Sequence, residues 1–457
     1  MRNAARTLFL SLLAVVSAVS IPCFAQDTAS RMEQVVQWYV GGNRFMGSVL
    51  VARGDKILLN KGYGSADLEW DIPNSSTTKF RIGSLTKQFT AAAILLLEQR
   101  GKLKIDDPVK KYMPDAPAAW EKVTIFNLLT HTSGIPSFTS FPDYHSTEAT
   151  PTTPEKLVER FRDKPLEFQP GEKWNYSNSG YVLLGYLIEK ISGQSYKDFL
   201  QENFFKPLGM NDSGYDSNSA IIVHRAEGYT PSASKPMHAG YIDMSIPFSA
   251  GGLYSTTGDL LRWEQGLFGG KVLSQESLKK MTTPFKNDYA FGLGVLKANG
   301  HTIIEHNGGI EGFNAHMSYC PDDSVTVVVL ANLNGNVPSE LATKLMATAH
   351  GEKVVLPSER KEITLPKEVM ARYTGTYELT PGFFSIAITL EGDQLVEQAI
   401  SPPPIGPQPK APIYPESETR FFMKVVDAQL EFSKDEKGEF TVMTLHQNGR
   451  DIKGVKK

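Results

Sequence analysis

The sequence predicts an α/β fold, in which an antiparallel sheet flanked by helices holds an inserted all-helical region and is followed by a small all-β barrel. Strand patterns appear near residue 50 and return after residue 290, whereas the stretch between Ser84 and Thr283 is mostly helical with long loops. From about residue 368 onward, apolar and polar residues alternate with the two-residue period of a half-buried strand. The early and late strands can therefore form one sheet around the helical insertion.

The length and composition are those of a multidomain globular protein. The 457 residues suggest about three domains at roughly 150 residues each. Hydrophobic residues make up 41% of the chain, and the formal net charge is −3. The sequence contains no basic stripe, so a nucleic-acid partner is not expected. These numbers leave the oligomeric state open.

Residues 1–25 have the organisation of a secretory signal peptide. Two arginines near the N-terminus are followed by a short apolar core and a small-x-small cleavage site before Gln26. The apolar core is too short for a stable membrane span. After cleavage, Cys320 is the one remaining cysteine, so no intramolecular disulfide is possible. We therefore predict a bacterial protein that is periplasmic or secreted.

The strands and helices follow in an order that fits this architecture. Two early strands joined by Gly54-Asp55 form a hairpin. Strands are expected at residues 47–53, 56–61, 290–297, 302–306, 314–319 and 324–331. The clearest helices are expected at residues 85–100, 154–162, 180–191, 196–205 and 339–350.

The chain is expected to divide into two folded units. The sheet and its helical insertion occupy residues 26–351, and a linker covers residues 352–367. A β-rich barrel unit occupies residues 368–457. Within that unit, the Pro-rich stretch at residues 401–415 is expected to be an irregular loop.

Ser84 and Lys87 form the first candidate site. They lie three residues apart at the start of a predicted core helix, so their side chains share one face of it. A serine becomes nucleophilic when a base removes its proton, and a lysine is such a base only when its amine is neutral. The structural alternative is that Ser84 only caps the helix. The spacing alone does not identify the site, because Ser-x-x-Lys also recurs at Ser76, Ser232, Ser277 and Ser358. Ser84 is distinguished by its context, since a predicted core helix begins there.

Tyr176-Ser177-Asn178 is the second candidate motif. It follows a Pro-Gly turn and precedes a predicted helix, so it is expected on an exposed loop with rigid flanks. Tyr176 could move a proton if Lys87 lowers its pKa, and the Asn178 amide could orient a substrate carbonyl. The structural alternative is a loop tyrosine before an Asn or Ser helix cap.

His306-Asn307-Gly308-Gly309 is the third candidate motif, expected to end a strand and open a glycine-rich turn. A backbone N–H in this turn, together with the N–H of Ser84, would form an oxyanion hole. An unperturbed histidine titrates near pH ~6.5, so His306 is expected to gain charge as the pH falls towards 6. The structural alternative is a strand end with a flexible turn.

No metal and no cofactor are expected. His301 and His306 lie on one predicted strand with five-residue spacing, so their side chains point to opposite faces, and no third ligand lies nearby in sequence. His131 precedes a glycine stop at the end of a predicted helix and is interpreted as structural.

In chain order these three motifs resemble those of the serine β-lactamase and penicillin-binding protein superfamily. The resemblance is closest to class C β-lactamases, D-Ala-D-Ala carboxypeptidases of the same branch and related esterases, and it covers about residues 35–349. Supporting segments include Phe80-Arg81-Ile82-Gly83 and Gly251-Gly252-Leu253-Tyr254-Ser255. The C-terminal unit, with Tyr373-Thr374-Gly375-Thr376-Tyr377, looks like the lipocalin-like barrel often appended to such proteins.

The resemblance implies a role for each candidate residue. Ser84 would be the acylated nucleophile and Lys87 its activating partner. Tyr176 would relay protons, Asn178 would hold the substrate amide, and Gly309 would supply the second oxyanion N–H.

One departure from the resembling family concerns the third motif. β-Lactamases carry Lys-Thr-Gly where this chain has His306-Asn307-Gly308, and family members with histidine there include esterases and D-amino-acid peptidases. His306 would then contact substrate. The sequence thus predicts an exported serine hydrolase that acts through an acyl-enzyme on a small ester, amide or peptide. The alternatives are a β-lactamase or D-Ala-D-Ala carboxypeptidase, and a non-catalytic penicillin-binding-like protein.

Overall fold

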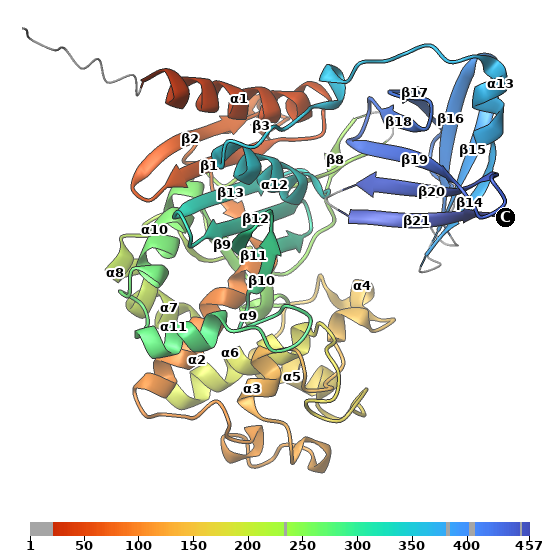
Figure 1. The fold of residues 1–457 in the computed structure, drawn as a ribbon. Helices are drawn as coiled ribbons and strands as arrows, with labels where there is room; N and C mark the ends of the chain where they lie inside the picture. The colour runs from red at the N-terminus through yellow and green to blue at the C-terminus, as the bar shows by residue number, and fades with distance from the viewer. Residues whose placement is uncertain (1–21, 233–234, 381–383, 402–406, 448–449) are drawn as a thin grey trace, which may run out of the picture.

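The computed structural model describes residues 22–232, 235–380, 384–401, 407–447 and 450–457 (Figure 1). Most of the predicted signal peptide, residues 1–21, lies outside the described residues. Helix α1 (Pro22–Gly41) runs through the predicted cleavage position before Gln26. Within the described ranges, no helix combines the length and the apolar character that a membrane crossing requires.

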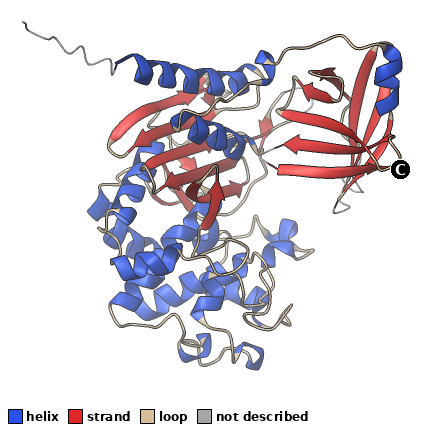
Figure 2. Ribbon diagram, in the orientation of Figure 1, coloured by secondary structure: helices blue, strands red, loops and turns tan. Residues whose placement is uncertain are grey.

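A six-stranded antiparallel sheet forms the centre of the larger unit, with the strand order β10-β11-β12-β13-β1-β2 (Figure 2). The strands are β1 (Gly47–Arg53), β2 (Lys56–Tyr63), β10 (Gly294–Ala298), β11 (His301–Ile310), β12 (Phe313–Cys320) and β13 (Val325–Ala331). Strands β1 and β13 pair with Gly47 opposite Ala331. The prediction that the first hairpin and the returning strands share one sheet is confirmed.

The central strands are buried on both faces, and their alternate residues enter two different cores. On β1, Val49 and Val51 pack with α1 and α12 (Val337–Ala349), whereas Leu50 and Ala52 face the inserted helices. Strand β13 alternates in the same way. Helices α1 and α12 lie side by side over one face of the sheet (Figure 1). The sheet therefore separates a small outer core from the large core that surrounds the candidate site.

The inserted region between β2 and β10 covers the other face. Its longer helices are α2 (Thr86–Gln99), α5 (Pro154–Arg162), α6 (Asn178–Ser192), α10 (Thr257–Phe268) and α11 (Gln275–Thr282). Its shorter helices are α3 (Ile125–Leu129), α4 (Tyr144–Thr147), α7 (Tyr196–Leu200), α8 (Lys206–Leu208) and α9 (Phe248–Gly251). Helices α2, α6 and α9 pack against one another. The helix expected at residues 196–205 changes at Gln201 into a π-helical turn.

Short strands fix the entry of the chain into α2. Strands β5 (Phe80–Arg81), β9 (Leu253–Ser255) and β6 (Gly214–Tyr215) form a three-stranded sheet. The N–H of Ile82 also donates to the carbonyl of Leu253, at 3.0 Å. The remaining short strands pair as β3 (Ser65–Asp67) with β4 (Ile72–Pro73) and β7 (Tyr229–Thr230) with β8 (Met237–His238).

The C-terminal unit is a closed barrel in which β21 pairs back to β14. It follows the short helix α13 (Lys367–Met370). Its strands are β14 (Gly375–Leu379), β15 (Ser385–Glu391), β16 (Gln394–Ile400), β17 (Ala411–Pro415), β18 (Arg420–Met423), β19 (Ala428–Lys434), β20 (Phe440–Gln447) and β21 (Arg450–Lys456). Of the irregular loop expected at residues 401–415, residues 402–406 lie outside the described residues, and the expectation is wrong at residues 411–415, where strand β17 forms. Strand β17 is needed there, because without it β16 and β18 would leave the barrel open.

The barrel and the larger unit have separate cores and are joined by charged contacts. The barrel core contains Tyr377 and Phe432 and shares no residue with either core of the larger unit. Lys344 on α12 pairs with Asp427 of the barrel unit, and Arg31 on α1 pairs with Glu359 in the connecting segment at 2.5 Å.

A chain truncated after Arg360 is therefore expected to fold without the barrel. It keeps both cores of the larger unit and the Arg31–Glu359 ion pair, and calorimetry should show one cooperative transition. A matched chain ending at His350 loses the buried Leu356, whose burial contributes about 1.5–3 kcal/mol, so its Tm should be lower. If neither chain folds, the two units depend on each other.

Candidate active site

Ser84 lies in a tight turn that leads into α2. The 3-10 helix η1 (Gly83–Leu85) precedes Thr86, the first residue of α2, and no side chain caps this turn. Gly83 has a φ of +50°, and a Cβ there would stand 2.8 Å from the backbone nitrogen of Gly309. Glycine is therefore required at position 83, because the turn has a left-handed residue pressed against β11. The helix-cap alternative for Ser84 does not describe this geometry.

The amine of Lys87 lies among three oxygen atoms. Its Nζ is 3.0 Å from Oγ of Ser84, 2.8 Å from Oδ1 of Asn178 and 2.8 Å from the carbonyl oxygen of Ala250. The amide and carbonyl oxygens can only accept hydrogen bonds. A neutral amine can donate to both of them and still present its lone pair to the Ser84 hydroxyl. This is the geometry of a base beside a nucleophile.

Complete burial favours the neutral form of the Lys87 amine. The residue has 0% relative exposure, and this desolvation lowers the pKa of its amine well below the usual value near 10.5. The Nζ lies 4.8 Å from the ring centroid of Tyr176 and 5.5 Å from that of Tyr181. No carboxylate forms a salt bridge with this amine among the residues that the structure describes.

Tyr176 is buried beside the pair, but its pKa is not lowered. Burial raises the pKa of Tyr176 above its usual value, and a hydrogen bond with the Ser84 side chain offsets part of that shift. The expectation that Lys87 lowers this pKa is wrong, because a neutral amine provides no positive charge to stabilise a phenolate. Tyr176 is therefore a neutral phenol at the site, and Lys87 is the group suited to accept a proton.

Asn178 and Tyr176 are positioned by the helix cap between them. Ser177 caps α6 by accepting from the N–H of Gly180, which leaves Asn178 in the first helical turn with its side chain free to reach Lys87. Nδ2 of Asn178 donates to Oγ1 of Thr139 at 3.0 Å, which orients Oδ1 towards the amine. The structural alternative, that an Asn or Ser of this motif only caps a helix, is thus correct for Ser177 and not for Asn178.

His131 supports the same loop from behind. Its Nδ1 accepts from the backbone N–H of Ser177 at 3.1 Å, and its ring packs 4.4 Å from that of Tyr176. Burial is the main cause that keeps the pKa of His131 well below its usual range. The structure therefore agrees with the structural interpretation of His131.

His306 lies within a strand and stays neutral. Strand β11 continues to Ile310, so the expectation that His306 ends a strand is wrong. The Nδ1 atom is 2.5 Å from the carbonyl oxygen of Asn307 and Nε2 is 3.0 Å from the hydroxyl of Tyr289, so the ring donates through Nδ1–H and accepts from Tyr289. The pKa of His306 is lowered to about 4, chiefly by burial. The expected gain of charge near pH 6 is therefore wrong.

Glycines bring the third motif against Ser84. A Cβ on Gly308 would stand 2.0 Å from the carbonyl oxygen of Ile82 and 3.1 Å from the backbone nitrogen of Ser84. The backbones of residues 308–309 and 83–84 are thus in direct contact, and Ser84 and Gly309 line the same pocket. This contact requires glycine at position 308 and brings two backbone segments to the nucleophile.

The pocket beside Ser84 is partly open and contains about 430 Å³ of empty space, which includes the solvent at its mouth. It is lined by Ser84, Phe138, Thr139, Tyr144, Asn178, Ile242, Pro247, Ala250, Gly251, Gly309, Ile310 and Glu311. His306 is not among these lining residues; it lies behind them, with its ring 6.4 Å from that of Tyr176. The structure brings the other expected residues together around the Ser84–Lys87 pair.

Glu311 is a pocket residue that the sequence reasoning missed. Its Oε2 is buried and has no hydrogen-bond partner among the described residues. Burial raises the pKa of this carboxyl, with a smaller contribution from Glu148. The sequence position of Glu311 could have pointed to this role, because Glu311 lies two residues after Gly309 in the turn of the third motif. A charged residue in such a turn can face a ligand.

Comparison with known proteins agrees with this geometry. Residues 32–350 match the beta-lactamase family, and residues 359–456 match a domain family described as of unknown function (DUF3471). The chain is 30% identical to penicillin-binding protein 4* of Bacillus subtilis over 91% of this chain and 95% of the relative. It is 33% identical to a putative penicillin-binding protein of the same organism over 66% of this chain and 74% of the relative.

Solved structures show the same fold. A penicillin-binding protein homologue from Pyrococcus abyssi superposes with a TM-score of 0.65 and 26% identity, covering 93% of this chain and 99% of that one. A D-stereospecific amidohydrolase from Streptomyces superposes with a TM-score of 0.60 and 25% identity, covering 72% of this chain and 99% of that one.

The fold and the site define a serine hydrolase of the β-lactamase and penicillin-binding type. Because the family match covers most of the chain, the protein belongs to the beta-lactamase family, and a closed β-barrel follows the family domain.

The neutral state of Lys87 predicts a pH effect on stability that does not depend on activity. The folded state holds this amine unprotonated, whereas the unfolded chain protonates it below pH ~10.4. The wild type should therefore gain stability relative to Lys87→Met as the pH rises from 6 to 9, by up to about 1.4 kcal/mol per pH unit. Denaturant unfolding of both proteins at several pH values measures this slope. A difference that stays constant with pH would mean that Lys87 is protonated in the folded protein.

Proposed function

We propose that the chain is an exported serine hydrolase that acts through an acyl-enzyme on an ester or a peptide-like amide. The observation that carries the proposal is the 3.0 Å contact between Oγ of Ser84 and the buried amine of Lys87. The other two contacts of that amine are to oxygens that only accept, so its lone pair is directed to the serine. A protein that only bound ligands would not need this arrangement.

The reaction follows from these positions. The Ser84 hydroxyl gives its proton to Lys87 as Oγ attacks the carbonyl carbon, and the N–H groups of Ser84 and Gly309 stabilise the oxyanion. The tetrahedral adduct collapses to an acyl-serine ester, and the protonated Lys87, through the neutral phenol of Tyr176, returns the proton to the leaving alcohol or amine. Water then attacks the ester and gives its proton, through Tyr176, to Lys87. Lys87 returns a proton to Oγ of Ser84 as the acid is released, which regenerates Ser84.

Asn178 and His306 have supporting roles in this proposal. Asn178 lines the pocket, and its Nδ2 group can donate to a substrate carbonyl in place of Oγ1 of Thr139. His306 acts through Tyr289, and a neutral imidazole supplies no fixed positive charge for a substrate carboxylate.

The substrate is proposed to be a peptide-like amide or an ester without a carboxylate near the scissile bond. The β-lactamase pattern Lys-Thr-Gly is replaced here by His306-Asn307-Gly308, and Glu311 adds a carboxylate to the pocket. Both features disfavour an anionic substrate, and the match to a D-stereospecific amidohydrolase supports an amide. The second candidate is a D-Ala-D-Ala carboxypeptidase or β-lactamase, which the penicillin-binding relative favours through its coverage of nearly the whole chain.

A periplasmic or secreted location belongs to the same proposal. It rests on the signal-peptide pattern of residues 1–25 and on the penicillin-binding relatives. A cell-fractionation experiment with the full chain tests it, and mature protein beginning at Gln26 is the expected product.

Ser84 is expected to be the one residue that a fluorophosphonate labels. Peptide mapping should place a single adduct on the peptide containing Ser84, because its hydroxyl is paired with a neutral amine. Ser84→Ala should abolish both the adduct and ester hydrolysis. Ser277→Ala is the matched control, since Ser277 has the same Ser-x-x-Lys spacing in α11 but no contact with Lys87. An adduct that survives in Ser84→Ala would contradict the assignment.

Glu311 is expected to set the charge preference of the pocket. At pH 8, Glu311→Gln should raise kcat/KM for a carboxylate-bearing ester relative to a neutral ester by roughly 5- to 10-fold, which corresponds to about 1–1.4 kcal/mol of removed repulsion. In the wild type this ratio should rise as the pH falls, because Glu311 has a raised pKa and becomes neutral. The Glu121→Gln control should keep the pH dependence, since Glu121 neither lines the pocket nor contributes to the raised pKa of Glu311. An unchanged ratio in Glu311→Gln would exclude Glu311 from substrate selection.

A further inference from the structure

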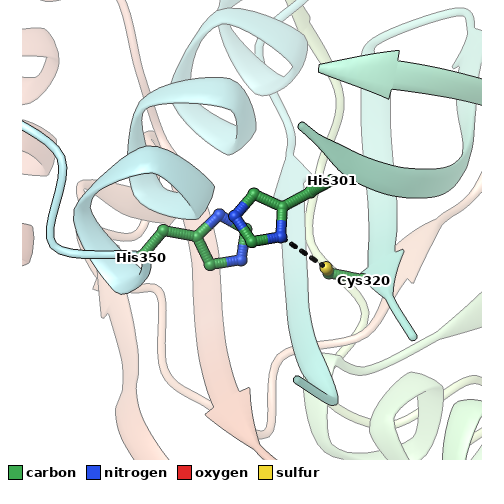
Figure 3. Close-up of side chains that lie close together, drawn as sticks. All are labelled: His301, Cys320 and His350. Carbon is green, nitrogen blue, oxygen red and sulfur yellow. Dashed lines mark hydrogen bonds between the residues drawn. The ribbon is translucent and has the colours of Figure 1, made fainter. Parts of the chain in front are cut away.

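A thiol and two imidazoles meet at the end of the central sheet opposite the candidate active site. The cluster consists of His301, the first residue of β11, Cys320, the last residue of β12, and His350, which follows the end of α12 (Figure 3). One ligand atom from each residue lies within 4.8 Å of those of the other two. The Sγ atom of Cys320 is 3.8 Å from Nδ1 of His301, and the two rings stack with centroids 4.1 Å apart.

The cluster is distant from Ser84. His301 and Gly309 are eight residues apart on the same strand, which corresponds to roughly 26 Å at ~3.3 Å per residue. The proposed hydrolase reaction uses none of the three residues. They need a separate explanation.

Two carboxylates complete the surroundings of the cluster. Oδ2 of Asp322 lies 3.6 Å from Nδ1 of His301 and 4.0 Å from Sγ of Cys320, and Oδ1 of Asp323 lies 3.4 Å from Nε2 of His350. Asp322 is held in place because it accepts from the backbone N–H of Thr302 at 3.0 Å. The turn between β12 and β13 therefore directs oxygen ligands towards the thiol and imidazoles.

Two polar atoms of this group are buried without partners. Nε2 of His350 and Oδ1 of Asp323 have no hydrogen bond among the described residues, and the His350 side chain is only 5% exposed. A buried polar atom without a partner costs free energy. A cation bound between the imidazoles and the carboxylate would remove that cost.

We propose that His301, Cys320 and His350, together with a carboxylate of Asp322 or Asp323, form a structural binding site for Zn²⁺ or a similar borderline-soft cation. One thiolate, two imidazoles and one carboxylate are ligand types that zinc accepts in a tetrahedral site. Binding forms the zinc–sulfur bond as the Cys320 thiol releases its proton to solvent, so one proton leaves for each ion bound.

The distances are compatible with such a site after small side-chain movements. With Zn–S of about 2.3 Å and Zn–N of about 2.0 Å, tetrahedral ligands lie about 3.5 Å apart, close to the 3.8 Å between Sγ and Nδ1. The stacked rings must turn so that one nitrogen of each points to the same place. His301 is partly exposed, which gives the ion a path of entry from solvent.

The consequence is a clamp between α12 and the sheet. His350 lies where the chain leaves the larger unit for the barrel, so a bound ion would tie the end of α12 to β11 and β12. The sequence did not predict this metal site, because only His306 and nearby residues were considered as partners of His301. The partners found here, Cys320 and His350, come from distant positions in the chain.

Metal binding by the full-length, untagged chain tests the proposal. After treatment with a chelator, the protein is titrated with Zn²⁺ against a chromophoric competitor and, separately, with Co²⁺. We expect one Zn²⁺ per chain, a Tm raised by several degrees, and a cobalt–thiolate charge-transfer band in the near ultraviolet. Fluorophosphonate labelling of Ser84 should be the same with and without metal, which separates this result from the test of the proposed function.

Variants assign the ligands. Cys320→Ser should lose the cobalt–thiolate band and His350→Gln should weaken zinc binding at least 10-fold, whereas His145→Gln, an exposed histidine away from the cluster, should bind as the wild type does. The absence of a cobalt–thiolate band in the wild type, or equal zinc binding by wild type and Cys320→Ser, would overturn the proposal. The wild-type spectrum decides the question even if a variant fails to fold.

Discussion

The amine of Lys87 can remain neutral only where water is excluded on every side, and the architecture of the larger unit depends on that constraint. Helices α6 and α9 pack against α2, and strand β11 packs against the 3-10 helix η1 that leads into α2, so each contributes to the enclosure. Two of them also supply the acceptors, through Asn178 and Ala250. A charged amine there would lose more hydration than these contacts return, because no carboxylate pairs with it in the described part of the chain. In the proposed mechanism, the same burial that stabilises the core creates the base that activates Ser84.

Close backbone contact is the second requirement of the site. The turn at Gly83 and the strand at Gly308 approach until no Cβ could fit between them. This approach positions backbone N–H groups where charge develops on a substrate oxygen, and backbone donors do not change with pH. In the proposed function, Glu311 in the pocket lining and neutral His306 behind it determine which substrate charge is favoured. A fixed cation at position 306 would favour carboxylates, whereas a neutral ring there and the carboxyl of Glu311 favour uncharged or positively charged groups.

The two ends of strand β11 belong to two different candidate sites. At Gly309 the strand forms part of the reaction site, and at His301 it carries a cluster that we interpret as a structural metal site. The barrel begins shortly after that cluster and has its own core. Stability and catalysis are thus assigned to opposite ends of one sheet, so changes at the clamp or in the barrel need not alter the geometry around Ser84.

The sequence by itself determined the order of the elements and predicted that Ser84 and Lys87 form a pair. Period-two strands, core helices and the Ser84–Lys87 spacing are local patterns, and local patterns can be read from neighbouring residues. The protonation states could not be read in this way. The pKa values of Tyr176 and His306 move in directions that the sequence reasoning did not expect, because desolvation depends on side chains brought in from distant segments. For the same reason the cluster around Cys320 became visible only in the tertiary structure, because folding brings together side chains from distant positions in the chain.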